Sequence, residues 1–87
     1  MPKFISEHTF PPGGFTREQV CKISEASQQD SVVRGYRSFI NLTEGKAFYI
    51  LEVPNKAAVA TWFQKMGMPY GNITEVELEG ERGAIKK

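Results

Sequence analysis

Two carboxylates and one guanidinium are the residues of this chain whose types and spacing could support chemistry. Glu7 lies in an alternating segment near the start, and Arg37 and Glu52 lie in two later alternating segments. Like charges held close together raise the pKa of one carboxylate, and a neighbouring guanidinium offsets that effect. If folding gathers the three side chains, they form a small polar pocket. The alternative, which is the commoner outcome for charge clusters, is a partly solvated salt bridge that contributes under about 1 kcal/mol.

The single histidine and the single cysteine do not indicate a further site. The chain has one histidine, His8, and one cysteine, Cys21, so we do not expect a tetrahedral zinc site within one chain. His8 and Glu7 are neighbours in a strand and point to opposite faces, and we expect His8 at the sheet rim, solvated or hydrogen-bonded. Cys21 has no histidine or basic pair beside it, which is typical of an inert thiol. We therefore assign no catalytic residue and no metal ligand, and the cofactor stays unknown.

Length and charge restrict the class of protein. The chain has 87 residues and a formal net charge of +1, which predicts one domain, residues 1–80, and a flexible tail, residues 81–87. A balanced charge argues against a nucleic-acid partner, and no apolar run is long enough for a membrane span. The start lacks the apolar core of a signal peptide and the single cysteine fits a reducing compartment, so we expect a cytoplasmic protein.

Six elements are predicted to position the charged residues. Strands are expected at residues 3–10, 36–42, 46–53 and 72–79, and helices at 17–32 and 56–66. A two-residue turn at Glu44 and Gly45 would place Arg37 opposite Glu52 and Phe39 opposite Ile50. This β-α-β-β-α-β order predicts an α+β, ferredoxin-like fold, in which a four-stranded antiparallel sheet of order 4-1-3-2 has both helices on one face. We further expect the first and third strands to run parallel, which would place Glu7 and Glu52 at the same end.

The sheet face without helices is expected to be too apolar to stay in water. Alternation assigns the helix-covered face to Phe4, Tyr36, Ile40, Leu42, Tyr49, Leu51, Val53, Val76 and Leu78. The open face receives Ile5, Glu7, Arg37, Phe39, Asn41, Phe48, Ile50, Glu52, Ile73 and Glu75. We predict a homodimer in which two such faces meet and enclose a ligand cavity lined by Glu7, Arg37, Phe39, Phe48 and Glu52. The alternative is a monomer with an ordinary mixed surface.

Five segments of the chain are shared with a known family: "MPKF" with Glu7, the hairpin "INLTEGKAFYI", the helix start "VPNKAAVATWF", the "GMP" after it, and "ITEVE". On these segments the chain resembles a small, mostly bacterial family of unknown function whose characterised branch is nickel-binding or nickel-responsive. It covers nearly the whole chain and implies a ferredoxin-like fold, a homodimer and a metal-binding role. Relatives commonly carry histidine or cysteine at Phe39, Tyr49 and Trp62, and tryptophan and tyrosine at Arg37 and Asn41. Because nickel prefers nitrogen-rich sites, these differences indicate that the fold carries over and the nickel chemistry does not.

Three classes of function are compatible with these features. The first is a dimeric binding protein that holds a small molecule or a metal ion between its sheets. The alternative is a cofactor-free enzyme of the monooxygenase or isomerase type, which rests on fold analogy alone. The third is a structural or regulatory dimer that binds no ligand. The expected open face lacks a histidine and a tyrosine, which argues against the enzyme.

Overall fold

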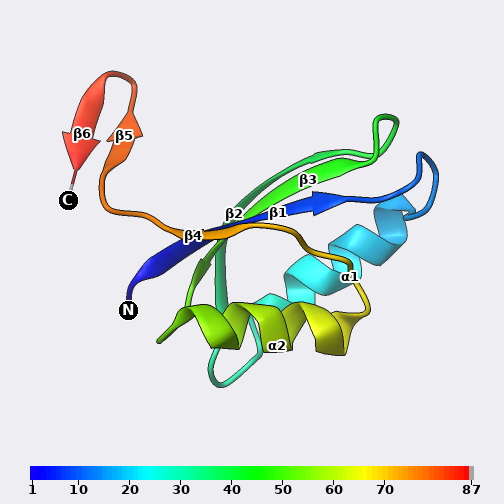
Figure 1. Cartoon of the computed structure of the whole chain (residues 1–87), viewed down its shortest axis with the longest axis horizontal. Helices are drawn as coiled ribbons and strands as arrows, with labels where there is room; N and C mark the ends of the chain where they lie inside the picture. Colours follow the sequence, from blue (N-terminus) through cyan, green and yellow to red (C-terminus); the bar gives the residue numbers. More distant parts are fainter. Residues whose placement is uncertain (87) are drawn as a thin grey trace.

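The computed structural model describes residues 1–86 and has the predicted order of elements as far as residue 75. Four strands form one antiparallel sheet of order β2-β3-β1-β4, and both helices pack on the same face of it (Figure 1). Read from the other edge this is the predicted 4-1-3-2 order, so the fold class is confirmed. The elements are β1 (Lys3–Thr9), α1 (Arg17–Ser27), β2 (Arg34–Asn41), β3 (Lys46–Glu52), α2 (Lys56–Met66), β4 (Ile73–Glu75), β5 (Glu79–Glu81) and β6 (Ala84–Lys86).

Helix α1 begins as predicted and ends five residues early. Thr16 caps it in a capping box with Gln19, whose backbone N–H donates to the Thr16 hydroxyl at 3.1 Å. The helix does not continue to residue 32, because the Asp30 carboxylate accepts hydrogen bonds from the backbone N–H groups of Val32 and Val33. This turn directs Val33 into the core, where it is buried.

Helix α2 matches its predicted bounds. The Asn55 side chain accepts a hydrogen bond from the Ala58 N–H at the start, and Gly67 ends the helix with a left-handed φ of 73°. Its apolar stripe is buried, and Trp62 and Phe63 both lie in the core. The helix therefore contributes packing to the side of the sheet that it covers.

The register of the β2–β3 hairpin differs from the prediction by two residues. Asn41, and not Thr43, lies opposite Lys46, so the loop has four residues. The Asn41 side chain accepts a hydrogen bond from the Glu44 N–H at 2.9 Å, and Gly45 adopts a φ of 71°. A side chain that bridges the loop in this way, together with a left-handed glycine, favours this longer loop over a two-residue turn. A shift of two leaves side chains on their predicted faces, because the strand period is two.

Strand β4 is shorter than predicted and shows the opposite phase. Ile73 pairs with Ser6 and is buried on the helix-covered side, although we expected it on the open face. Thr74 pairs with Ile5 instead, which places Thr74 on the open face and Glu75 on the other. A displacement of one residue reverses all side chains of a strand, so the predicted parity of β4 is wrong throughout.

The core lies between the sheet and the two helices. Four side chains predicted for this layer are buried: Phe4, Tyr49, Leu51 and Val53. Ile40, Leu42 and Val76 are half-buried. Leu78 is 59% exposed, against the prediction, because the chain leaves the sheet after β4.

The last part of the chain forms a separate two-stranded sheet of β5 and β6. Most of the segment for which we expected a flexible tail, residues 81–87, belongs to this hairpin, and residue 87 lies outside the described residues. The domain boundary at residue 80 and the flexibility of the tail stay predictions. Neither helix in residues 1–86 has the length and apolar content that a membrane span requires.

Candidate functional site

The open face of the sheet, which the helices do not cover, carries side chains in rows that run across the strands. One central row contains Phe39, Phe48 and Glu7, and the next contains Arg37, Ile50, Ile5 and Thr74. A polar row flanks them on either side, formed by Asn41, Lys46 and Thr9 at one end and by Arg34, Glu52 and Lys3 at the other. The open face is therefore an apolar strip, containing one carboxylate and one guanidinium, between two polar borders.

Two phenylalanines dominate the accessible apolar surface of this strip. Phe39 is 57% exposed and Phe48 is 41% exposed, and they lie directly opposite each other on β2 and β3. Ile5 and Ile50 are half-buried beside them. Aromatic side chains at adjacent positions of a sheet form a continuous surface, so the strip is a patch rather than a set of scattered residues.

The structure brings four of the five predicted cavity residues onto this strip. Phe39, Phe48 and Glu7 share one row, and Arg37 lies in the adjacent row, opposite Ile50. The predicted pairing of Arg37 with Glu52 is wrong, because the register is shifted and a bulge lies between residues 35 and 37.

Glu52 lies apart from the other predicted cavity residues. β1 and β3 run antiparallel, whereas we expected them to run parallel, so Glu52 lies opposite Lys3 and Glu7 lies opposite Phe48. Glu7 and Glu52 are four positions apart along the sheet, and at about 3.4 Å per residue this separation is about 14 Å. The two carboxylates therefore do not form the close pair that we expected.

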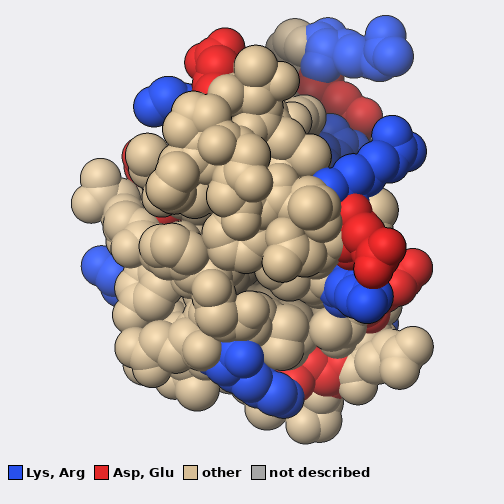
Figure 2. Space-filling view, turned by 90° about the vertical axis from the view of Figure 1, so that its right-hand side faces the viewer, with Lys and Arg blue, Asp and Glu red and all other residues tan. Residues whose placement is uncertain are grey.

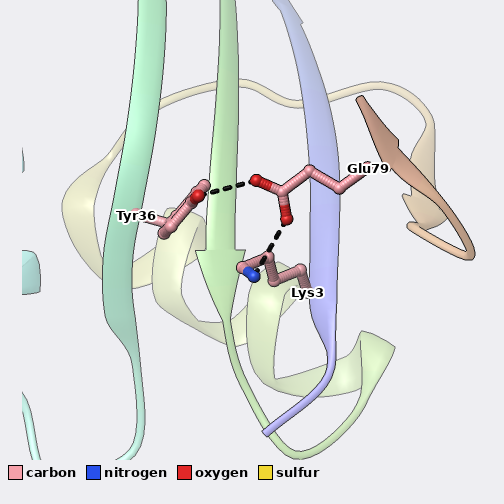
Figure 3. A network of polar contacts seen from close by, with 3 residues as sticks. All are labelled: Lys3, Tyr36 and Glu79. Atoms are coloured by element: carbon pink, nitrogen blue, oxygen red, sulfur yellow. Dashed lines mark hydrogen bonds and ion pairs between the residues drawn. The ribbon is translucent and has the colours of Figure 1, made fainter. Parts of the chain in front are cut away.

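A polar network not anticipated from the sequence occupies one border of the open face (Figure 3). Lys3 Nζ and a Glu79 carboxylate oxygen are 3.0 Å apart, and the Tyr36 hydroxyl donates to the other carboxylate oxygen at 2.6 Å. The Lys3 ammonium also lies 4.4 Å from the centre of the Tyr36 ring. Glu79 thus joins the segment after β4 to two strands of the sheet.

The position of Tyr36 corrects its predicted place on the helix-covered side. The bulge before Arg37 turns Tyr36 toward the open face, where it meets Lys3. The hydrogen bond to the Glu79 carboxylate raises the pKa of the Tyr36 phenol, which stabilises its protonated form. Sequence patterning gave no signal for this network, because it depends on the bulge and on the path of the chain after β4.

His8 is buried, which corrects its predicted place at the sheet rim, and it is hydrogen-bonded, which is one of the two expected alternatives. Its Nδ1 lies 2.7 Å from the Pro69 carbonyl oxygen, and its Nε2 lies 2.8 Å from the Ser6 hydroxyl. Because a carbonyl can only accept, Nδ1 carries the proton and Nε2 accepts from Ser6. The ring also packs 4.3 Å from that of Phe63 and 5.1 Å from that of Tyr49, between centroids. Burial lowers the pKa of His8, so the histidine is a neutral element of the core.

Potential metal donors do not converge in the described part of the chain. No group of three His, Cys, Asp or Glu residues that could hold a metal ion occurs within residues 1–86. Cys21 is exposed on α1, and both ring nitrogens of His8 are engaged inside the core. These residues therefore provide no preformed transition-metal site within one chain.

Hollows on the helix-covered side are small or open. One of about 130 Å³ lies between α1 and the edge of β2, lined by Ser24, Ser27, Gln28 and Tyr49, among others. It is below the volume of about 300 Å³ at which ligand pockets begin. A larger groove of about 560 Å³ runs outside β4, past Phe4 and Ile73. The groove is open to solvent, and its ionisable lining residues are Lys56 and Glu75.

One end of the molecule is nearly free of charge. Figure 2 shows this end, where the loops after β1, β2 and α2 meet, and its broad centre carries no coloured side chains. Residues 10–16 and 66–74 contain no Lys, Arg, Asp or Glu. This end of the molecule therefore offers few charged groups to a ligand or partner.

Comparisons with known proteins agree with this fold. A family model described as "Nickel responsive protein SCO4226-like" matches residues 4–76. The crystal structure of SCO4226 from Streptomyces coelicolor A3(2) superposes with a TM-score of 0.72 at 22% identity, over 90% of this chain and 99% of that one. At this identity the superposition shows the fold alone. No curated protein matches the chain.

Proposed function

Because the chain belongs to the nickel-responsive SCO4226-like family, we propose that it is a small dimeric binding protein whose two sheets enclose a ligand. The ligand lies against the strip formed by Glu7, Arg37, Phe39 and Phe48. The proposed ligand is a small molecule or a metal ion, and the side chains of the strip are better suited to a small molecule. Glu52 belongs to the border of this chamber rather than to its centre.

The exposure of Phe39 and Phe48 carries the proposal. These two side chains are 57% and 41% exposed, in one row with Glu7 and beside half-buried Ile5 and Ile50. Both helices are on the other side of the sheet, and the described chain provides no element that covers this strip (Figure 1). A second copy supplies a surface of matching size and character, and a two-fold arrangement lets each strip cover the other.

A dimer of this kind leaves room for a ligand near the charged groups. Sheets that pack face to face lie about 10 Å apart, which the two phenylalanine rings of each copy partly fill. Glu7 and Arg37 lie at neighbouring rows and on strands separated by β3. A molecule with an apolar body between the rings and one polar group near Glu7 or Arg37 would match these surroundings.

Nickel does not fit the residues that the open face provides. Ni²⁺ favours imidazole nitrogen, and thiolate suits soft sites, whereas the strip offers one carboxylate beside a guanidinium. The His8 nitrogens lie 2.7 Å from the Pro69 carbonyl and 2.8 Å from the Ser6 hydroxyl, on the opposite side of the sheet from Glu7. The family's response to nickel is therefore not expected to extend to tight nickel binding by this chain.

Two measurements test the proposal on the purified full-length protein. Sedimentation velocity across the micromolar range should show a species of twice the 9.8 kDa chain mass, and native mass spectrometry should show a bound molecule that denaturation releases. Glu7→Ala should lower its occupancy, while Glu44→Ala, in the β2–β3 loop away from the strip, should not. A monomer at all concentrations would overturn the dimer. A dimer that carries no bound molecule and gives no calorimetric heat with NiCl₂ would overturn the binding role.

A further inference from the structure

The C-terminal hairpin lies beyond the residues matched by the family model, and its turn residues favour this structure. That model ends at residue 76, and β5 and β6 pair from Glu79↔Lys86 to Glu81↔Ala84. The two residues between the strands, Arg82 and Gly83, have φ values of 50° and 87°. Positive φ at both central positions is the signature of the two-residue turn that suits the twist of a hairpin. The sequence therefore encodes a hairpin here.

The apolar side chains of the hairpin segment are largely exposed, although its base is held to the sheet through Glu79. It projects from the end of the sheet toward the side away from the helices (Figure 1). Ile85 is 67% exposed and Leu78 is 59% exposed. Ile85 lies opposite Gly80 in the strand pair, and Leu78 directly precedes β5. An isolated two-stranded hairpin is marginally stable in water, so this hairpin needs a surface to pack on.

The base of the hairpin is fixed on the open face. Glu79 begins β5 and is held by Lys3 at 3.0 Å and by the Tyr36 hydroxyl at 2.6 Å (Figure 3). Lys3 belongs to the polar border row of the open face, beside the apolar strip. The hairpin therefore leaves the molecule from the edge of the surface that a second copy would cover, and it rises on that copy's side.

We infer that the β5–β6 hairpin is a dimerisation arm that packs on a second copy of the chain through Leu78 and Ile85. The inference rests on the proposed function, because it requires two open faces to meet. In a two-fold dimer each copy contributes one arm and receives the arm of the other copy. The contact made by Leu78 and Ile85 therefore occurs twice in the assembly. The arms then close one end of the chamber, next to the Lys3, Tyr36 and Glu79 network.

The test compares charge substitutions at matched exposed positions. Ile85→Asp is on the arm, and Thr43→Asp places the same charge on the β2–β3 loop at the opposite end of the sheet (Figure 1). Sedimentation equilibrium should show a dimer dissociation constant at least about tenfold higher for Ile85→Asp and unchanged for Thr43→Asp. Because Ile85 does not contribute to the core, the circular dichroism of both variants should match that of the wild type.

Amide hydrogen exchange provides a second, independent measurement. Exchange in residues 79–86 of the wild type should slow as its concentration passes the dimer dissociation constant. If Ile85→Asp and the wild type dimerise equally and exchange in this segment does not depend on concentration, the arm is overturned while the dimer stands. If the wild type is a monomer throughout, the proposed function fails, and the arm fails with it.

Discussion

Replacing Phe48 by alanine tests the open face most directly. Phe48 lies in the centre of the row between Phe39 and Glu7, and it makes no part of the buried core. The substitution therefore removes surface available to a partner while leaving the fold nearly intact. The expected loss in the free energy of unfolding is that of one cross-strand pair, about 0.2–1 kcal/mol.

The effect on dimerisation follows from the exposed area. Phe48 is 41% exposed, so of the roughly 200 Å² of a phenylalanine side chain about 80 Å² remain for a partner to cover. At about 25 cal/mol per Å² this corresponds to about 2 kcal/mol in each copy. A two-fold dimer loses the contribution twice, about 4 kcal/mol, which raises the dimer dissociation constant about a thousandfold.

Sedimentation equilibrium over a wide concentration range measures that constant for the wild type and the variant. Thr43→Ala, an exposed loop substitution away from the strip, serves as the control and should leave the dissociation constant unchanged. A Phe48→Ala protein that dimerises within about threefold of the wild type would show that this face is not the interface. The reasoning from exposed area would then be refuted even if a dimer exists.

Three further outcomes follow from a buried histidine, from two glycines with positive φ and from a hydrogen-bonded tyrosine. Burial lowers the pKa of His8 below its ordinary 6.5. The contribution of His8 to the free energy of unfolding is therefore complete above pH 6.5 and is lost as the pH falls through the pKa of the folded state. Urea unfolding should show this free energy declining by at most about 1.4 kcal/mol per pH unit in the wild type, and the decline should be absent in His8→Gln. Gly45→Ala should lower the free energy of unfolding by at least about 2 kcal/mol, because a Cβ at this position overlaps a backbone carbonyl oxygen. Gly13→Ala should lower it by about 1 kcal/mol, because Gly13 has a similar φ but open space around it. Equal losses for the two variants in chemical denaturation would contradict this reasoning. Glu79→Gln should lower the pKa of Tyr36 toward 10.0, and an NMR titration of the Tyr36 ring that does not move would show that the hydrogen bond is absent in solution.

The period of the strands explains which sequence predictions succeeded. In β2 and β3 the predicted loop is too short, and the register moves by two residues. Phe39 and Phe48 nevertheless stay on the open face, since a shift of two preserves alternation. In β4 the error is one residue, and it reverses Ile73 from the open face to the core. Patterns in a short, exposed strand carry too few apolar positions to fix its phase.

Contacts between distant segments explain what the sequence could not provide. His8 is held by the Pro69 carbonyl, a partner 61 residues away on the segment that follows α2. No local pattern predicts that this carbonyl reaches the ring. The Arg82–Gly83 turn is different, because a glycine at this position between short alternating segments is a recognisable hairpin signal. It escapes prediction because so short a hairpin, without a core of its own, resembles a flexible end.

The separation of Glu7 from Glu52 is a consequence of how the strands are connected. A helical crossover between the first two strands makes them parallel, and a hairpin between β2 and β3 makes that pair antiparallel. Because β2 is parallel to β1 and antiparallel to β3, β3 runs antiparallel to β1, its neighbour in the sheet. Glu7 and Glu52 both lie near the C-terminal ends of their strands, so they lie at opposite ends of the sheet. The same connectivity places Glu7 beside the aromatic row instead of beside another carboxylate. Its neighbours are Phe48 and, beyond it, Phe39, which is why the open face is better suited to an apolar molecule with a polar group than to a metal ion.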